Sequence, residues 1–436
     1  MDEKLVAEMD GKSAEMASKM ENRASADPGA RQAAGGHGEK AGAGSGDMVL
    51  HEWQQRVLDA AQTGRALRLR GGGSKDWYGQ GLQGELFDTR AFAGIVAYEP
   101  SELVITARCG TTLAELEAVL AERGQMLAFE PPHFAVDSVN AADGAACLAS
   151  LATVGGMVAS GLAGPARASR GCVRDYLLGL QLLDGRGQVL NFGGQVMKNV
   201  AGYDVSRVMA GSLGILGIIL QVSLKVLPRP PATATLCFSL DEPRALQMMN
   251  QWAVKPLPQA ASSWFDGVLT LRLAGASAAV RSAQQQLGGQ VLDAQQADAH
   301  WHALREQTHG FFAGATAPAA ATEPAFDLWR LSVPATTPML IMPGQMLLEW
   351  GGAQRWLLTP RPPLAQAQQQ AAAIRQVAAS AGGHATLFRA ADKSVGVFHP
   401  LAPALAQIHA NLKQAFDPAG IFNPGRMFAD FALSGS

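Results

Sequence analysis

The chain has 436 residues, of which 48% are apolar, and its 35 Lys and Arg against 37 Asp and Glu give a formal charge of −2. This length predicts two or three domains rather than one core. The near-neutral balance excludes the clearly basic footprint of a typical nucleic-acid-binding protein. An acidic substrate would therefore be held by local positive charge and not by the field of the whole molecule.

The four cysteines stand far apart, at Cys109, Cys147, Cys172 and Cys237, and no pair has CxxC spacing. Such spacing cannot supply the clustered thiolates that an iron–sulfur centre uses. We interpret them as free thiols of a cytoplasmic protein, because disulfides are rare in a reducing cytosol. An iron–sulfur relay, if the protein feeds one, would lie on another chain.

The first 47 residues mix charges with Gly, Ala and Ser, which predicts a disordered extension with a short helix near residues 4–20. They contain no apolar segment of the secretory kind. Globular patterning starts at Met48, which is an alternative natural start of the protein. The longest uncharged stretch, 208–224, is shorter than the roughly 20 apolar residues of a membrane-spanning helix. It alternates from Ile218 onward, which predicts a buried strand.

Strand and helix signals alternate along the rest of the chain, and prolines at 228, 230 and 231 mark a domain boundary. We expect a first domain over 48–230 and a second, smaller α+β domain over 231–436. The expected elements are a helix from 49, strands at 66–70 and 103–108, a helix from the capping box Thr112–Glu115 to Gly124, strands from 176 with a turn at Asp184-Gly185, a strand at 218–226, a strand at 268–273, helices at 279–287 and 365–381, and a mobile loop at 313–325.

Residues 79–84 match G-x-G-x-x-G, the dinucleotide fingerprint of NAD-linked enzymes. That fingerprint has meaning only directly after a strand and at the start of a helix. Here no strand pattern precedes it, and no helix of adequate length fits before Pro100. We therefore interpret 79–84 as a loop, and an NAD-linked Rossmann enzyme is the least favoured alternative.

Three other glycine-rich clusters have a better context. The first, Gly71-Gly72-Gly73, directly follows the strand at 66–70, where successive backbone amides can form an anion-binding concavity. The second runs over 153–165 and continues to 169–175, and the third comprises 198–204 and 211–219. Such dense small residues indicate backbone that packs closely against another strand or against a ligand.

In this order and spacing, the three clusters resemble the PCMH-type FAD domain of vanillyl-alcohol-oxidase-like flavoproteins that act on 2-hydroxy acids. Further motifs resemble the FAD-binding subunits of bacterial glycolate oxidases, and the likeness covers most of residues 48–431. These motifs lie at 98–108, 129–133, 193–204, 381–386 and 416–427. The resemblance implies a PCMH-type FAD-binding domain followed by a smaller α+β cap domain.

The resemblance also implies where FAD lies: its pyrophosphate at 71–75, the flavin along 155–164 and 169–173, and its adenosine half near 214–219. The implied cofactor-binding residues are Gly71, Gly72, Gly73, Ser74, Lys75, Pro131, Gly155, Gly156, Ala159, Ser160, Gly161, Gly164, Ser169, Gly171, Val173, Gly214, Gly217, Ile218 and Ile219. Relatives with covalent flavin have a histidine where this chain has Lys75, so we expect non-covalent FAD. At Leu213 a carboxylate common in lactate dehydrogenases is missing, which removes a polar contact.

Catalytic residues are harder to nominate. Single-chain relatives carry Gly-Asp-Gly-Asn and Glu-His-Gly motifs in their second domain, and neither occurs here. His384 with Arg389 is the pairing that we nominate, since a 2-hydroxy acid needs a cation and a base; the alternative is that both are structural or interface residues. We expect no metal site, and we interpret His300 and His302 as a solvent-facing helix pattern. The stretch 134–151 is longer than expected for the family and suggests no function.

By the same resemblance, the chain would be one subunit of an oxidase that converts glycolate to glyoxylate. Its partners would be a larger FAD-containing subunit and an iron–sulfur subunit, with any contact to the inner membrane made through them. The sequence leaves open whether this flavin is an active site or an electron relay. Two alternatives remain: a self-sufficient dehydrogenase of another 2-hydroxy acid, and a non-catalytic assembly subunit.

Overall fold

The computed structural model describes residues 43–134, 151–194, 204–315 and 326–428. Residues 43–51 belong to a unit separate from residues 52–436. Helix α2 (Ala43–Thr63) begins upstream of Met48, where the helical pattern was expected to start. The expected helix near 4–20, most of the loop at 313–325 and nearly all of the stretch 134–151 lie outside the described residues.

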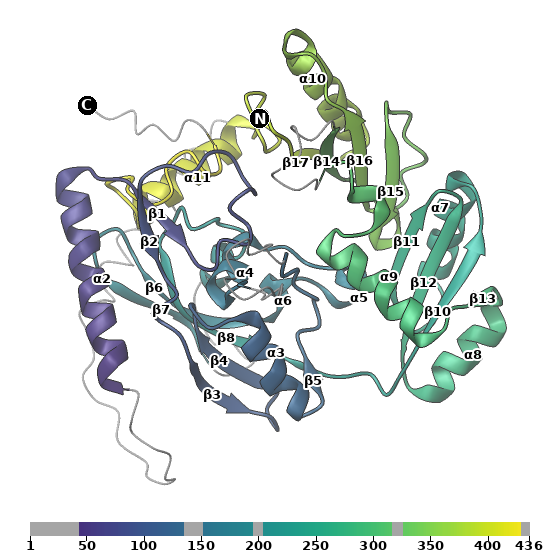
Figure 1. The fold of residues 1–436 in the computed structure, drawn as a ribbon, viewed down its shortest axis with the longest axis horizontal. Helices are drawn as coiled ribbons and strands as arrows, with labels where there is room; N and C mark the ends of the chain where they lie inside the picture. Colours follow the sequence, from purple (N-terminus) through teal and green to yellow (C-terminus); the bar gives the residue numbers. More distant parts are fainter. Residues whose placement is uncertain (1–42, 135–150, 195–203, 316–325, 429–436) are drawn as a thin grey trace, which may run out of the picture. The chain divides into compact units, whose positions relative to one another are not determined.

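A five-stranded antiparallel sheet in the order β3-β4-β8-β6-β7 forms the core of the first part of the chain (Figure 1). Its central strand, β8, is buried on both faces apart from Gln221 and Lys225, which confirms the buried strand expected from residue 218. A strand with covered faces needs a nearly continuous apolar run, as found here. The strands are β3 (Ile95–Glu99), β4 (Val104–Arg108), β6 (Leu177–Leu183), β7 (Val189–Gly193) and β8 (Ile218–Lys225).

Short elements surround this sheet and complete the first part. Thr112 caps helix α3 by accepting a hydrogen bond from the amide of Glu115 at 3.2 Å, as the capping box predicts. Residues 79–84 form a loop between β1 and β2, which confirms that the G-x-G-x-x-G match is not a dinucleotide fingerprint. The elements are β1 (Leu67–Arg70), β2 (Glu85–Asp88), α3 (Leu113–Glu122), β5 (Gln125–Met126), α4 (Val154–Ser160), α5 (Arg167–Arg170), α6 (Val173–Tyr176), η1 (Ser206–Met209) and β9 (Leu227–Pro228).

The second part is built on an eight-stranded antiparallel sheet in the order β13-β10-β12-β11-β15-β16-β14-β17. The expected strand at 268–273 and helices at 279–287 and 365–381 are confirmed within a residue or two. The elements are β10 (Ala232–Ser239), α7 (Glu242–Ala253), β11 (Gln259–Phe265), β12 (Val268–Gly275), α8 (Ser277–Leu287), β13 (Gln290–Val291), α9 (Ala294–Glu306), η2 (Gly310–Phe312), β14 (Phe326–Ser332), β15 (Gln345–Glu349), η3 (Trp350–Gly352), β16 (Gln354–Pro360), α10 (Leu364–Ser380) and β17 (His384–Arg389).

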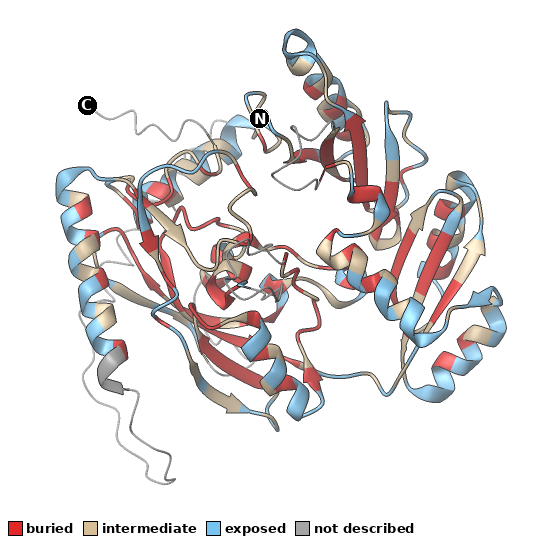
Figure 2. Ribbon diagram, viewed as in Figure 1, coloured by how far each residue is buried: buried red, intermediate tan, exposed pale blue. Residues whose placement is uncertain are grey.

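The two faces of this sheet have different partners because successive strand residues point to opposite sides. Trp329 and Leu331 of β14 pack in one cluster with Ile374 of α10. Leu328, the residue before Trp329, packs on the other side, in a cluster that includes Tyr78 and Leu162 of the first part. Figure 2 shows the buried strand residues of both sheets in red. The second face therefore lies against residues of the first part together with Trp301 and Leu304 of α9.

The chain end returns to the first part. Helix α11 (Pro403–Phe416) carries Lys413, whose buried Nζ donates to the carbonyls of Ile215 at 2.7 Å and Phe422 at 2.8 Å. The same Nζ pairs with Asp417 at 2.6 Å, and Asp417 also accepts from the amide of Phe422 at 2.8 Å. Phe422 bridges to Leu67 of β1. Residues 413–427 thus pack against the predicted first domain although they follow the second in sequence.

The described helices include none that is long and apolar enough to cross a membrane. Cys109, Cys172 and Cys237 are free thiols, and Cys147 lies outside the described residues. Burial raises the pKa of the Cys109 thiol to about 12, so it stays protonated and acts as a small apolar side chain.

The Lys413–Asp417 pair gives a first testable prediction. Asp417 is 0% exposed, and Asp417→Asn would leave the buried Lys413 ammonium without its counter-charge. Burial already lowers the pKa of Lys413, and Asp417 opposes that effect. We expect the free energy of unfolding to fall by roughly 3–5 kcal/mol. Urea denaturation measures it, with the exposed Asp298→Asn on α9 as control; equal midpoints for both variants would contradict the expectation.

Candidate functional site

The glycine loop after β1 lines a cavity together with α4 and the returning chain end. It brings together eight of the residues expected to bind FAD: Gly71, Gly72, Gly73, Ser74, Lys75, Gly156, Ala159 and Ser160. It also includes residues outside the expected cofactor-binding set, namely Leu69, Arg70, Asp76, Tyr78, Leu82, Thr153, Leu213, Asn423 and Arg426. Asn423 fixes the arrangement, because its side chain accepts from the amide of Leu69 and donates to the carbonyl of Leu213, both at 2.8 Å.

The glycines of this loop are required by the chain itself. A Cβ on Gly71 would lie 2.2 Å from Oγ1 of Thr153, and one on Gly72 would lie 1.5 Å from the carbonyl oxygen of Leu151. Gly73 has φ +76°, a left-handed conformation that favours glycine. The small size of these glycines therefore lets the loop pack on residues 151–153. From the sequence, the glycines were instead expected to let a pyrophosphate approach the backbone.

The amides of the loop remain available for an anion. Among the described residues, no amide of 71–75 donates to a backbone carbonyl. Such a row of amides, next to a buried cation, fits the doubly charged pyrophosphate of FAD. The first residue of the loop to carry a charge is Lys75, and its burial lowers its pKa to about 8 while nearby Glu306 opposes the effect.

Five cations surround residues 74–79, and within the described chain none of them forms an ion pair with a carboxylate. Lys75 contacts Ser74, Arg330 contacts the Tyr78 hydroxyl, Arg389 contacts Gln307, and Lys393 and Arg426 donate only to carbonyls. Burial lowers the pKa of Lys393 to about 8, and Arg426 and Arg389 add to the effect. Burial alone lowers the pKa of Arg389 to about 9. Unpaired buried cations are costly, so this region is suited to an anionic ligand.

The other residues expected at the cofactor lie elsewhere. Gly164 lines a second cavity, described below, while the rest line neither of the two. The fold itself requires glycine at several of these positions. A Cβ on Gly155 would meet Cys109, one on Gly161 would meet Gly211, and Gly214 and Gly217 have positive φ. Ser169 donates to the carbonyl of Ala260 at 2.6 Å. The remaining ones are Pro131, Gly171, and the buried Val173, Ile218 and Ile219.

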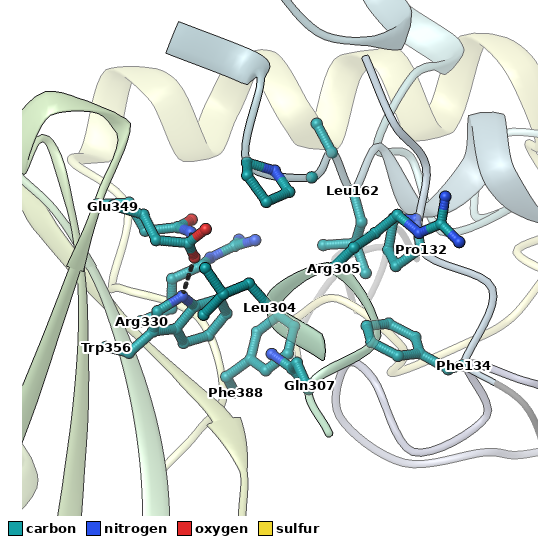
Figure 3. Close-up of a pocket in the computed structure, with 14 residues that line it drawn as sticks. Pro132, Phe134, Leu162, Leu304, Arg305, Gln307, Arg330, Glu349, Trp356 and Phe388 are labelled. Carbon is teal, nitrogen blue, oxygen red and sulfur yellow. Dashed lines mark hydrogen bonds between the residues drawn. The ribbon is translucent and has the colours of Figure 1, made fainter. Parts of the chain in front are cut away.

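The second cavity lies between the 132–134 and 162–165 segments, the end of α9 and one face of the eight-stranded sheet (Figure 3). Its charged and polar lining comprises Arg305, Gln307, Arg330, Glu349 and Gln354. Trp356 Nε1 donates to Oε2 of Glu349 at 2.6 Å, and Gln354 Nε2 donates to the same oxygen at 3.0 Å. None of these residues was predicted from the sequence as part of a site.

Glu349 is the acidic residue in the lining of this cavity, and its pKa is strongly shifted. Its side chain is almost fully buried, and this desolvation raises its pKa to about 7, while Trp356 and Gln354 oppose the effect and nearby Glu130 adds to it. Its carboxyl therefore changes charge near neutral pH, which is the range useful for acid–base chemistry.

The nominated pairing of His384 with Arg389 does not form. The two residues are the ends of β17, five positions apart, which is roughly 16 Å along an extended strand. His384 is exposed, whereas Arg389 lies over the ring of Trp77, with its guanidinium carbon 3.5 Å from the ring centroid. Only Arg389 therefore stays near the cavities, next to Gln307.

Of the two histidines on α9 that were expected to face solvent, only His302 does so. His302 is exposed, but His300 is half-buried and its Nε2 lies 3.0 Å from the Ser263 hydroxyl. Burial lowers the pKa of His300 to about 4, helped by His309 and Arg272. The solvent-facing interpretation is thus wrong for His300. The described residues contain no group of three or more side chains arranged to hold a metal ion.

The raised pKa of Glu349 gives a second prediction. Between about pH 4.5 and 7 the folded state holds a proton that the unfolded state has lost, so stability falls as pH rises through that window. Glu349→Gln removes this titration. We expect the wild-type chain to lose about 3 kcal/mol relative to Glu349→Gln between about pH 5 and 8, measured by urea denaturation. Parallel stability curves for the two proteins would show that Glu349 does not titrate there.

Known proteins of similar sequence include FAD-binding proteins, which agrees with a cavity suited to an anionic cofactor. Residues 51–193 match the FAD binding domain family. Glycolate oxidase subunit GlcE of Escherichia coli (strain K12) is 43% identical over 86% of this chain and 96% of its own length. Glycolate oxidase subunit GlcD of Bacillus subtilis (strain 168) is 36% identical over 20% of this chain and 18% of its own.

Among solved structures, an alkyldihydroxyacetonephosphate synthase superposes with a TM-score of 0.58 at 15% identity, covering 86% of this chain and 75% of that one. This likeness shows the fold, a PCMH-type FAD-binding domain with an α+β cap. Since the identity to GlcE extends over nearly the whole of that protein, the chain belongs to the GlcE family of glycolate oxidase subunits and is an FAD-dependent oxidoreductase.

Proposed function

We propose that the chain is the FAD-binding subunit of a multi-subunit glycolate oxidase, which converts glycolate to glyoxylate. Its partners are a larger FAD-containing subunit and an iron–sulfur subunit that takes the electrons onward. The observation that carries the proposal is the anion-binding cavity at 71–75, where free amides and buried cations converge beside the second cavity. The relatives named GlcE and GlcD, both glycolate oxidase subunits, support an enzyme of several chains.

In this arrangement the amides of 71–75 hold the pyrophosphate of FAD, and Lys75 and Arg426 supply positive charge. FAD bound there provides a two-electron acceptor for the alcohol carbon. The binding is non-covalent, because Lys75 occupies the position where relatives with covalent flavin have a histidine. Arg426 positions the loop, since its guanidinium donates to the carbonyls of Lys75 at 3.1 Å and Asp76 at 3.0 Å.

The cofactor can be tested directly on the purified full chain. We expect yellow protein with a flavin absorption spectrum that releases intact FAD into solution on acid denaturation. Flavin that stays with the precipitated protein would contradict non-covalent binding. Colourless protein that FAD cannot reconstitute, also in the presence of its native partners, would contradict the proposed function.

A matched pair of glycine substitutions tests the loop. Gly72→Ala places a Cβ against the Leu151 carbonyl, which displaces the loop, whereas a Cβ on exposed Gly81 meets nothing within 4 Å. We expect Gly72→Ala to retain less than about a tenth of the wild-type FAD, because distorting the amide row weakens charge-assisted hydrogen bonds. Gly81→Ala should retain all of it. The flavin-to-protein absorbance ratio measures both, and equal retention would show that the 71–75 loop does not hold FAD.

A further inference from the structure

The second cavity presents an unusual set of groups on one face of the eight-stranded sheet. Arg330 of β14 is directly opposite Trp356 of β16, and Glu349 of β15 is directly opposite Gln354 of the same strand. Because side chains two residues apart share a face, Arg330, Trp356 and Glu349 project to the same side. Strands β14 and β15 are separated by β16, so the backbones of Arg330 and Glu349 are roughly 10 Å apart. Figure 3 shows these three side chains at the cavity.

Arg330 has unused hydrogen-bonding capacity. Its Nη2 donates to the Tyr78 hydroxyl at 3.2 Å, and its guanidinium lies against the ring of Phe388 at 5.1 Å. In the described chain its other nitrogens have no acceptor, and no carboxylate pairs with it. A guanidinium held on two aromatic rings with donors directed to a cavity is suited to bind a carboxylate in bidentate fashion.

Glu349 complements Arg330 because it offers a hydrogen-bond acceptor to the cavity. Both N–H donors, from Trp356 and Gln354, end on Oε2, which fixes the orientation of the carboxyl group. Oε1 accepts no hydrogen bond from the described residues, although the residue is only 3% exposed. Glu349 lines the cavity, so a ligand with a hydroxyl group can form a hydrogen bond with this oxygen.

We propose that this cavity binds a small 2-hydroxy carboxylate, with its carboxylate on Arg330 and its hydroxyl on Oε1 of Glu349. The indole of Trp356 lies between the two anchors and forms the floor for the short carbon skeleton. This assignment rests on the proposed function and deepens it: the chain binds substrate itself and does not serve only as an electron relay. Arg389, nominated from the sequence, supports the site from outside through Gln307, to which it donates at 3.0 Å.

The first test is binding of glycolate to the FAD-loaded full chain by isothermal titration calorimetry. Acetate, which lacks the hydroxyl, and ethylene glycol, which lacks the carboxylate, are the comparison compounds. We expect glycolate to bind at least about tenfold more tightly than either, since each loses one anchored polar group. Equal affinity for acetate, or no measurable glycolate binding, would overturn the assignment.

Arg330→Gln removes the cation, and Arg281→Gln on the exposed side of α8 removes a charge elsewhere. We expect Arg330→Gln to weaken glycolate binding at least about tenfold, with Arg330→Lys recovering part of it, while Arg281→Gln binds as wild type. The flavin spectrum of each variant reports an intact fold. Wild-type affinity in an Arg330→Gln protein with a normal flavin spectrum would remove Arg330 from the site.

Glu349→Gln tests the other anchor through pH. Glycolate stays an anion from about pH 6 to 8, so ionisation of Glu349 should repel it, and affinity should fall by up to about tenfold per pH unit above 7. The surrounding charged or titratable groups are Glu130 after β5, Arg167 on α5, Arg272 on β12, Arg330 on β14, and His300, Arg305 and Glu306 on α9. Glu349→Gln leaves them all in place, so affinity should become flat with pH. The same fall in both proteins would exclude Glu349.

Failure of this inference differs from failure of the proposed function. A chain that releases FAD but binds no glycolate keeps the proposed cofactor and loses the substrate site, which makes its flavin a relay. A chain that binds no FAD loses the proposed function before glycolate is added.

Discussion

Positive charge that nearby carboxylates compensate only in part is the constraint on which the site depends. Lys75, Arg330, Arg389, Lys393 and Arg426 converge on residues 74–79, and burial lowers the pKa of four of them. Bringing such groups together in a place of low dielectric costs free energy, which Glu306 near Lys75 and Asp76 near Arg426 offset only in part. An anionic cofactor would offset it, so ligand binding and folding stability are linked at this site. The fold must therefore hold these cations in position by other means.

Those other means are backbone carbonyls and the returning chain end. Lys393 and Arg426 donate to carbonyls of the 75–79 segment, which ties the second part of the chain and its end to the glycine loop. Lys413 and Asp417 anchor the last segment in turn. A carbonyl satisfies a cation's hydrogen bonds without cancelling its charge. The loop is thus rigidly placed while its potential stays positive.

The sequence could predict the features that depend on local patterns. The uncharged alternation from Ile218 indicated β8, and the glycines after a strand indicated the loop. Features that depend on register could not be found in this way. Glu349 ends an apolar strand, and only the pairing of β15 with β16 brings Trp356 to its carboxyl group. The nomination of His384 with Arg389 failed because β17 is extended between the two residues and holds them at its opposite ends.

The chemistry of the second cavity bears on whether this flavin is a relay or an active site. A flavin that only passes electrons needs close, dry packing, and apolar side chains supply it at the lowest free energy. Here the sheet face next to the glycine segments instead holds a carboxyl group with one unpartnered oxygen and a guanidinium without a counter-ion. Replacing both by apolar residues of similar volume would stabilise the fold. Polar groups that are retained despite this loss of stability are arranged for a polar ligand. Because Arg330 and Glu349 are separated by one intervening strand, their spacing matches a small hydroxy acid rather than a second large cofactor.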